Sequence, residues 1–152
     1  MNDSEFLKLA IEQARKSVVQ GGFPAGAIIV KDGVVIAEGV SIGSQLNDPT
    51  GHAETSTIRA ACQKLGTTNL EGAVLYASLQ PCLMCFSVAN WAGITKIVYS
   101  CRRTDEMIDK NYYEGRNELT DVNTENNRQI ELVFVPAFEN EMLGLIKEWE
   151  LN

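Results

Sequence analysis

Apolar residues recur every three or four positions over the first twenty residues, which predicts an amphipathic helix. Asp3 or Ser4 can act as its N-cap, and Gly21-Gly22 ends it after about Gln20. One face of this helix would pack on the core and consists of Phe6, Leu7, Ala10, Ile11, Ala14 and Val18.

The pattern then changes to short apolar runs that predict strands. Two of them, 27–31 and 34–40, meet at Asp32-Gly33, a dipeptide that suits the tight turn of a β-hairpin. A polar loop, 41–51, follows. The later predicted elements are a helix from about His52 to Leu65 ended by Gly66, a strand at 73–78, a helix opened by Pro81 and running through about Trp91, strands at 95–100 and 130–135, and a closing helix at 138–151.

The alternation of strands and helices after the hairpin predicts an α/β fold. We expect a mixed five-stranded sheet with helices on both faces, which is a three-layer α/β/α sandwich. Segment 102–128 has no readable period and is predicted as a loop with short helical pieces. The chain has no internal repeat or low-complexity linker, so residues 1–152 are predicted to form a single domain.

Composition indicates an ordinary globular protein, with 45% hydrophobic and 22% charged residues. The N-terminus lacks a secretory signal pattern, and no apolar run approaches the roughly 20 residues of a membrane span. We therefore expect a cytoplasmic protein without a membrane partner. Thiols stay reduced in that compartment, so the four cysteines are expected to be metal ligands or buried apolar side chains rather than disulfides.

The net charge of −7 is unevenly distributed. Residues 1–103 carry 9 Lys/Arg and 8 Asp/Glu, a net of +1, whereas residues 104–152 carry 4 and 12, a net of −8. An acidic C-terminal third would repel a polyanion, so the charge pattern disfavours a nucleic-acid partner.

The stretch PCLMC places Cys82 and Cys85 three residues apart at a predicted helix start. Both sulfurs then lie on one helix face, where the helix dipole favours the thiolate that binds zinc. His52, the only histidine, also falls at a predicted helix start. One imidazole and two thiolates leave the fourth tetrahedral position open for water, as in a catalytic zinc site. Glu54 is placed to act as a general acid/base on that water.

Other interpretations of these residues remain. A redox pair would need Cys82 and Cys85 alone and would leave His52 and Glu54 without a role. A closed structural zinc site would need a fourth ligand, for which Cys62 or Cys101 is available.

The combination of His-x-Glu and Pro-Cys-x-x-Cys is similar to the signature of the zinc-dependent cytidine and nucleobase deaminases. Within that superfamily the segments DPTGHAE, STIRAAC, LYASLQPCLMC and NWAGITKIVYS look most like guanine deaminases and tRNA-adenosine deaminases. The resemblance implies a cytidine deaminase-like fold, a Zn²⁺ cofactor held by His52, Cys82 and Cys85, and Glu54 as the catalytic residue. It also implies that zinc-activated water attacks the C–NH2 carbon of an aminated base and that ammonia leaves.

At the positions that contact the substrate in the family, this sequence departs from the family's usual residues. Ser41 stands where the family usually has asparagine, and KNYYEG replaces the family's carboxylate-bearing run, so Glu114 could supply that carboxylate with Tyr112 or Tyr113 stacking on the ring. The full set of predicted substrate-binding residues is Ser41, Phe23, Pro24, Ala53, Asn90, Trp91 and Glu114.

The predicted reaction is hydrolytic deamination of a purine-like, amino-substituted nucleobase or nucleoside, similar to that of guanine deaminases. The alternatives are a tRNA-adenosine deaminase, which the acidic C-terminal third disfavours, a cytosine or cytidine deaminase, and a protein that uses zinc structurally or binds a base without turnover. Relatives of this kind form dimers, so a homodimer is expected.

Overall fold

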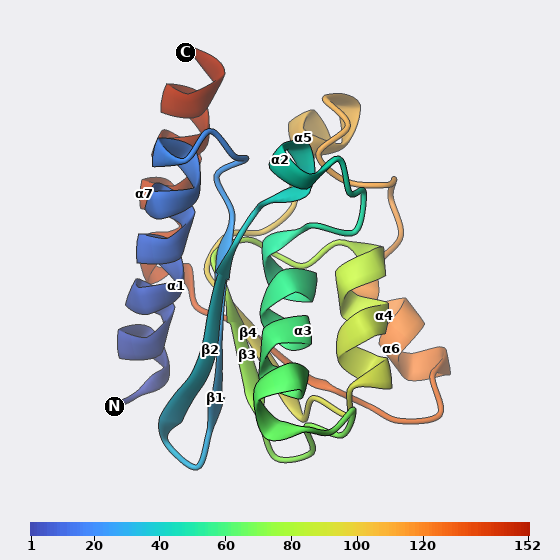
Figure 1. The fold of residues 1–152 in the computed structure, drawn as a ribbon. Coiled ribbons are helices and arrows are strands. Elements are labelled where there is room, and N and C mark those ends of the chain that lie inside the picture. The colour runs from blue at the N-terminus through green and yellow to red at the C-terminus, as the bar shows by residue number, and fades with distance from the viewer.

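A five-stranded mixed sheet runs through the middle of the computed structural model, which describes residues 1–152 (Figure 1). The strand order is β2-β1-β3-β4-β5, with β1 antiparallel to both neighbours and β3, β4 and β5 parallel. The strands are β1 (Gly26–Lys31), β2 (Val34–Val40), β3 (Val74–Ala77), β4 (Lys96–Tyr99) and β5 (Glu131–Phe134).

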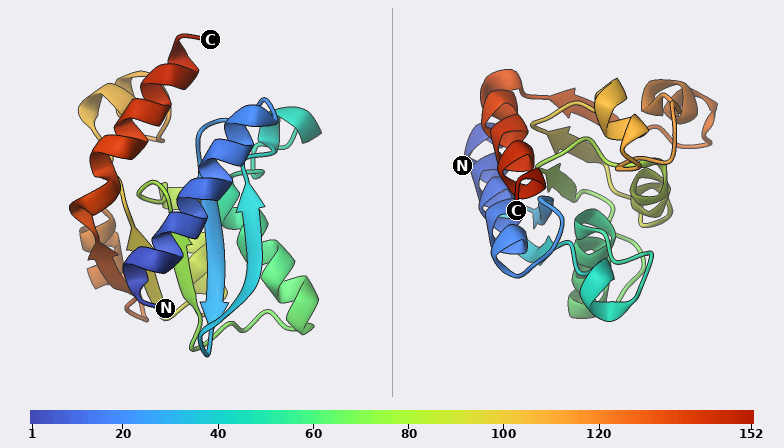
Figure 2. Two further views of the ribbon diagram at one scale, coloured as in Figure 1. Left: turned by 90° about the vertical axis from the view of Figure 1, so that its left-hand side faces the viewer. Right: turned by 90° about the horizontal axis from the view of Figure 1, so that it is seen from above.

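Helices cover both faces of this sheet (Figures 1 and 2). One face carries α1 (Asp3–Val19) and α7 (Glu139–Glu150), and the other carries α3 (Ala53–Leu65), α4 (Leu83–Trp91) and α6 (Leu119–Glu125). Two short helices, α2 (Gly43–Leu46) and α5 (Asp105–Asp109), lie at one end of the sheet, and a 3-10 turn (Pro136–Phe138) precedes α7. The predicted three-layer α/β/α sandwich is confirmed, as are the short helical pieces expected in segment 102–128. None of the helices combines the length and hydrophobicity needed to cross a lipid bilayer.

Strand β1 lies between the two helical layers, and its side chains alternate between them. Ile28 and Val30 pack with Phe6 and Leu7 of α1, whereas Ile29 belongs to the larger core on the α3 and α4 side. The hairpin turn is as expected: Asp32 and Gly33 both have positive φ, 52° and 74°, the left-handed pair that a two-residue β-turn requires.

Two predicted helix starts are wrong by one or two residues. Asn2 caps α1, because its side chain accepts from the N–H of Glu5 at 2.9 Å. Asp3 is turned toward the sheet, where it accepts from Tyr76 Oη at 2.7 Å and Lys96 Nζ at 3.0 Å. Likewise α4 begins at Leu83, after Pro81, because the sulfur of Cys82 accepts from the N–H of Cys85 and makes Cys82 the N-cap.

The segment that precedes β1 and the segments that follow β2, β3 and β4 all lie at the same end of the strands. This follows from the antiparallel hairpin and the parallel arrangement of β3 and β4. Loops from distant parts of the sequence therefore meet above the carboxyl ends of the parallel strands, where open α/β sheets bind ligands.

Candidate metal centre and substrate cavity

Two neighbouring helices begin at the three predicted metal ligands. His52 is the N-cap of α3 and Cys82 is the N-cap of α4, and both have extended backbone. Cys85 lies three residues into α4. Helices α3 and α4 pack side by side on the same face of the sheet, so their N-termini lie close together (Figure 1).

The ligand atoms form a close cluster. His52 Nδ1 lies 3.4 Å from Cys82 Sγ and 3.6 Å from Cys85 Sγ, and the three ligand atoms are all within 4.8 Å of one another. Zn–S bonds of about 2.3 Å and a Zn–N bond of about 2.0 Å at a tetrahedral angle separate nitrogen and sulfur by roughly 3.5 Å. The donor set and its spacing therefore fit zinc.

Cys62 and Cys101 lie outside this cluster. Cys101 is fully buried in the core, and Cys62 is half-buried near the end of α3. The interpretation of the cluster as a closed structural zinc site, with Cys62 or Cys101 as the fourth ligand, is therefore wrong. A redox pair is also disfavoured, because the imidazole of His52 lies against both sulfurs.

The surroundings act on the two sulfurs in opposite directions, and the hydrogen bond with Cys82, together with burial, raises the pKa of the Cys85 thiol. Hydrogen bonding from Cys85 and His52 holds the pKa of Cys82 below its usual range, which favours the thiolate. The buried hydroxyl of Thr55, on α3, lies 3.2 Å from Cys85 Sγ and can donate to the thiolate. Thr55 thus links α3 to a ligand on α4, as outer-shell partners of metal sites commonly do.

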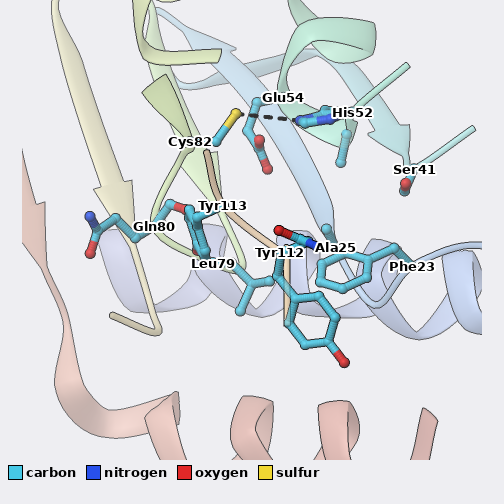
Figure 3. A pocket seen from close by; sticks show the side chains of 12 residues that line it. Phe23, Ala25, Ser41, His52, Glu54, Leu79, Gln80, Cys82, Tyr112 and Tyr113 are labelled. Atoms are coloured by element: carbon cyan, nitrogen blue, oxygen red, sulfur yellow. Dashed lines mark hydrogen bonds between the residues drawn. The ribbon is translucent and has the colours of Figure 1, made fainter. Parts of the chain in front are cut away.

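Glu54 lies in the first turn of α3 and is 5% exposed. Figure 3 shows its carboxylate directed into the cavity beside His52 and Cys82. Burial, together with the nearby Cys82, raises the pKa of Glu54 to about 7. A carboxyl group with this pKa can both accept and donate protons near neutral pH, as a general acid/base must.

A cavity of about 180 Å³ opens next to the metal cluster. This volume is below the roughly 300–1,000 Å³ of pockets for drug-sized ligands and suits a small ring system. The cavity is lined by Phe23, Ala25, Ser41, His52, Ala53, Glu54, Leu79, Gln80, Cys82, Asn111, Tyr112 and Tyr113 (Figure 3).

Comparison with known proteins agrees with this geometry. Residues 1–101 match the cytidine and deoxycytidylate deaminase zinc-binding region. The chain belongs to this family. It is therefore a zinc-dependent nucleobase or nucleoside deaminase, a hydrolase of C–N bonds, and the His52, Cys82 and Cys85 cluster is the family's zinc site.

Individual relatives show where the similarity lies. Guanine deaminase of Bacillus subtilis is 45% identical over 106 residues, which cover 69% of this chain and 68% of that protein. A tRNA-specific adenosine deaminase of Aquifex aeolicus is 41% identical over 100 residues, covering 66% of each chain. A structure from a study of A-to-I editing by tRNA:A34 deaminases superposes with a TM-score of 0.80 at 30% identity, over 93% of this chain and 99% of that one.

In this deaminase three of the seven predicted substrate-binding residues line the cavity. Phe23, Ser41 and Ala53 lie in its wall, as do Tyr112 and Tyr113. Pro24 is buried next to Phe23 but does not line the cavity.

Glu114 was predicted to supply a carboxylate to the base. It does not line the cavity; its carboxylate accepts from the N–H groups of Leu83 at 3.2 Å and Met84 at 3.0 Å. These are free amides of the first turn of α4, which attract a carboxylate. Glu114 therefore fastens its loop to the start of the metal-binding helix, and the prediction that it supplies a carboxylate to the base is not supported by its position.

Asn90 and Trp91 were also predicted to contact the substrate, and neither lines the cavity within this chain. They lie at the C-terminal end of α4, roughly 13 Å along the helix from Cys82 and roughly 8 Å from Cys85. Asn90 accepts from Arg128 through its backbone and side-chain oxygens, and Trp91 is 87% exposed.

Sequence reasoning missed Ser17, a buried residue of α1. Its hydroxyl donates to the carbonyl of Phe23 at 2.6 Å and accepts from the N–H of Ser41 at 3.2 Å. Ser17 thereby holds two walls of the cavity in place. A serine on the otherwise apolar face of the first helix was the available signal.

Proposed function

We propose that this deaminase hydrolyses an amino-substituted purine-like nucleobase or nucleoside, as guanine deaminases do, and releases ammonia. The observation that carries the proposal is the buried Glu54 carboxylate beside a three-ligand zinc site, in a small cavity with aromatic residues in its wall.

The form of the cavity supports a flat heterocyclic substrate. Phe23 and Tyr112 contribute aromatic rings, and Leu79 adds an apolar surface. The two rings contact each other edge to face at 5.1 Å, and Trp149 packs behind them at 5.0 Å from Phe23 and 5.8 Å from Tyr112. Because the rings are held by packing, they offer a rigid wall to a planar base.

Zinc bound by His52, Cys82 and Cys85 would bring the pKa of a water molecule from about 15.7 to near 7. Glu54 then acts twice. Its carboxylate takes a proton from the attacking water and passes it to the ring nitrogen beside the C–NH2 carbon, which makes that carbon electrophilic. The remaining water proton later goes through Glu54 to the amino group, which leaves as ammonia, and the ring keeps the oxygen as a carbonyl.

A tRNA-adenosine deaminase is the second candidate, because relatives with that name are nearly as similar to this chain. The charge of the C-terminal third weighs against it: 4 Lys/Arg against 12 Asp/Glu give residues 104–152 a net of −8. Such a segment disfavours approach of a phosphate backbone.

We also propose that the protein works as a homodimer. Helix α4 is apolar on nearly all sides, yet Met84 and Val88 are only half-buried and Trp91 is exposed. A helix with that composition normally has partners on every side. Sedimentation velocity tests this, with a particle of twice the mass of the 16.7 kDa chain expected.

One assay tests the substrate. Ammonia release is measured with guanine, guanosine, adenine, cytosine, cytidine, isocytosine, an aminotriazine and an adenosine-containing tRNA anticodon stem-loop, each with and without a zinc chelator. Chelator-sensitive turnover of guanine or guanosine supports the proposal. Turnover of the stem-loop alone, or of the pyrimidines alone, would replace it with the corresponding alternative.

A further inference from the structure

Most polar groups that line the cavity already have a partner. His52 and Cys82 belong to the zinc site, and Glu54 is the acid/base. Tyr113 Oη donates to the carbonyl of Gln80 at 2.6 Å, and Gln80 Oε1 accepts from the N–H of Arg103 at 3.0 Å.

Tyr112 is engaged on the outer side of the cavity. Its hydroxyl donates to Glu150 at 2.6 Å, and Lys110 pairs with the same carboxylate at 2.8 Å. Figure 3 shows the hydroxyl of Tyr112 directed away from the metal cluster and the amide of Gln80 turned outward. Both side chains therefore offer the cavity mainly their carbon surfaces.

Apart from Glu54, the acid/base, two polar side chains of the wall make no hydrogen bond inside the chain: the hydroxyl of Ser41 and the carboxamide of Asn111. The carboxamide alone carries both a strong donor and a carbonyl acceptor side by side. It can therefore form two hydrogen bonds at once with an edge that offers the complementary pair.

The backbone around Asn111 explains its conformation without using the carboxamide. Asn111 has φ 62° and follows α5. Its N–H donates to the carbonyl of Ile108, and the N–H of Tyr112 donates to the carbonyl of Met107. This is a left-handed helix end, which glycine or asparagine can form. The following residues are fixed by the Tyr113 and Glu114 bonds, so the loop holds Asn111, an exposed residue, in the cavity wall.

We propose that Asn111 is the residue that selects the substrate, by pairing with a ring edge in which an N–H lies beside a carbonyl. The inference rests on the proposed function, and it narrows the substrate class to aminated heterocycles that also contain a cyclic amide. The amidine edge of such a base faces Glu54 and the metal cluster during the reaction, so the cyclic amide remains available to Asn111 and, unlike the imidazole nitrogens of a purine, matches a carboxamide with an N–H directly beside a carbonyl. The amide oxygen of Asn111 accepts from the ring N–H, and its NH2 group donates to the ring carbonyl.

The test compares guanine with 2-aminopurine, which carries the same amino group but lacks the carbonyl and the adjacent N–H. Asn111→Gly keeps the left-handed backbone and removes only the carboxamide. We expect kcat/KM for guanine to fall roughly 10- to 100-fold, mainly through KM, because a paired bidentate contact is lost. The value for 2-aminopurine should stay within about threefold of wild type, since that base never forms the pair.

Asn47→Gly is the matched control. Asn47 also has a left-handed backbone, φ 53°, at the end of α2, and it does not line the cavity. It should leave both bases unaffected. Asn111→Asp, which keeps the size but cannot donate, should lower guanine turnover at least as much as Asn111→Gly.

Each outcome decides the inference. The inference is overturned if Asn111→Gly lowers kcat/KM equally for guanine and 2-aminopurine, or does not lower it for guanine. In either case, turnover of guanine by the wild-type protein would leave the proposed function intact. Absence of turnover of either base by zinc-loaded wild type overturns the proposed function and this inference together.

Discussion

The two sides of the cavity are built in different ways. On the metal side, His52, Cys82 and Glu54 lie at the starts of α3 and α4, which pack against the sheet, and Cys85 is fully buried. On the opposite side, Asn111 to Tyr113 lie in an irregular segment held by hydrogen bonds to Gln80, to the first turn of α4 and, through Tyr112, to α7.

The two sides of the cavity therefore differ in what fixes their residues in place. Backbone geometry and dense packing fix the metal side, so the positions of the reacting groups tolerate little change. Individual side-chain contacts fix the loop side, which can vary while the fold stays intact. Substitutions on the metal side should therefore affect turnover itself, and those on the loop side should affect substrate choice or stability.

The largest effect is expected for Cys82→Ser. The variant loses a thiolate ligand, so zinc content should fall from one per chain to near zero and ammonia release should become undetectable. Elemental analysis of the purified protein measures the metal. Cys62→Ser is the control, because Cys62 lies outside the cluster and should keep both zinc and activity. Full zinc retention in Cys82→Ser would show that the ligand assignment is wrong.

Glu54→Gln should separate chemistry from metal binding. The amide cannot carry protons, so kcat should fall by roughly 10²- to 10⁴-fold while zinc content stays at the wild-type level. Glu71→Gln, at an exposed position, serves as the control. Ammonia release at the wild-type rate from Glu54→Gln would refute the acid/base role.

Gly51→Ala tests how tightly the metal side is packed. A Cβ at Gly51 would lie 2.7 Å from the Cα and N atoms of Gly43, so α2 or the neighbouring His52 must move. We expect the free energy of unfolding to fall by about 1–3 kcal/mol and zinc to be lost faster to a chelator. Gly144→Ala in α7 meets no atom within 4 Å and should raise stability by up to about 1 kcal/mol. Equal urea denaturation midpoints for the two variants would contradict the packing argument.

Glu114→Ala should have the smallest effect and tests the loop side. The first turn of α4 loses two acceptors, which should cost about 1 kcal/mol of unfolding free energy, while KM changes only a few-fold. Glu114→Gln keeps one acceptor and should lie between wild type and Glu114→Ala. A KM increase above about 100-fold without loss of stability would instead place Glu114 on the base.

Sequence reasoning predicted the metal side well because its signals are short and local. The thiols of Cys82 and Cys85 are three residues apart, and His52 and Glu54 are two apart, so each half needs only one helix start to come together. The hairpin was equally accessible, since Asp32-Gly33 specifies its own turn.

The loop side was not predictable to the same extent, because its contacts join residues about 30 positions apart. Nothing in KNYYEG indicates that Glu114 bonds to amides of Leu83 and Met84 rather than to a base. Asn111 was missed because its place in the wall depends on the end of α5, a five-residue helix without a periodic pattern. Trp91 is exposed and lies outside the cavity wall of this chain, because family resemblance gives a neighbourhood along the chain and not the direction of a side chain.

X-ray absorption spectroscopy of the zinc in the purified, substrate-free protein tests the central claim most directly. We expect one nitrogen and two sulfur ligands from the protein, from His52, Cys82 and Cys85, with a single light oxygen-type ligand from solvent completing the shell. A third sulfur in the coordination shell, or protein free of zinc that still released ammonia, would contradict the account.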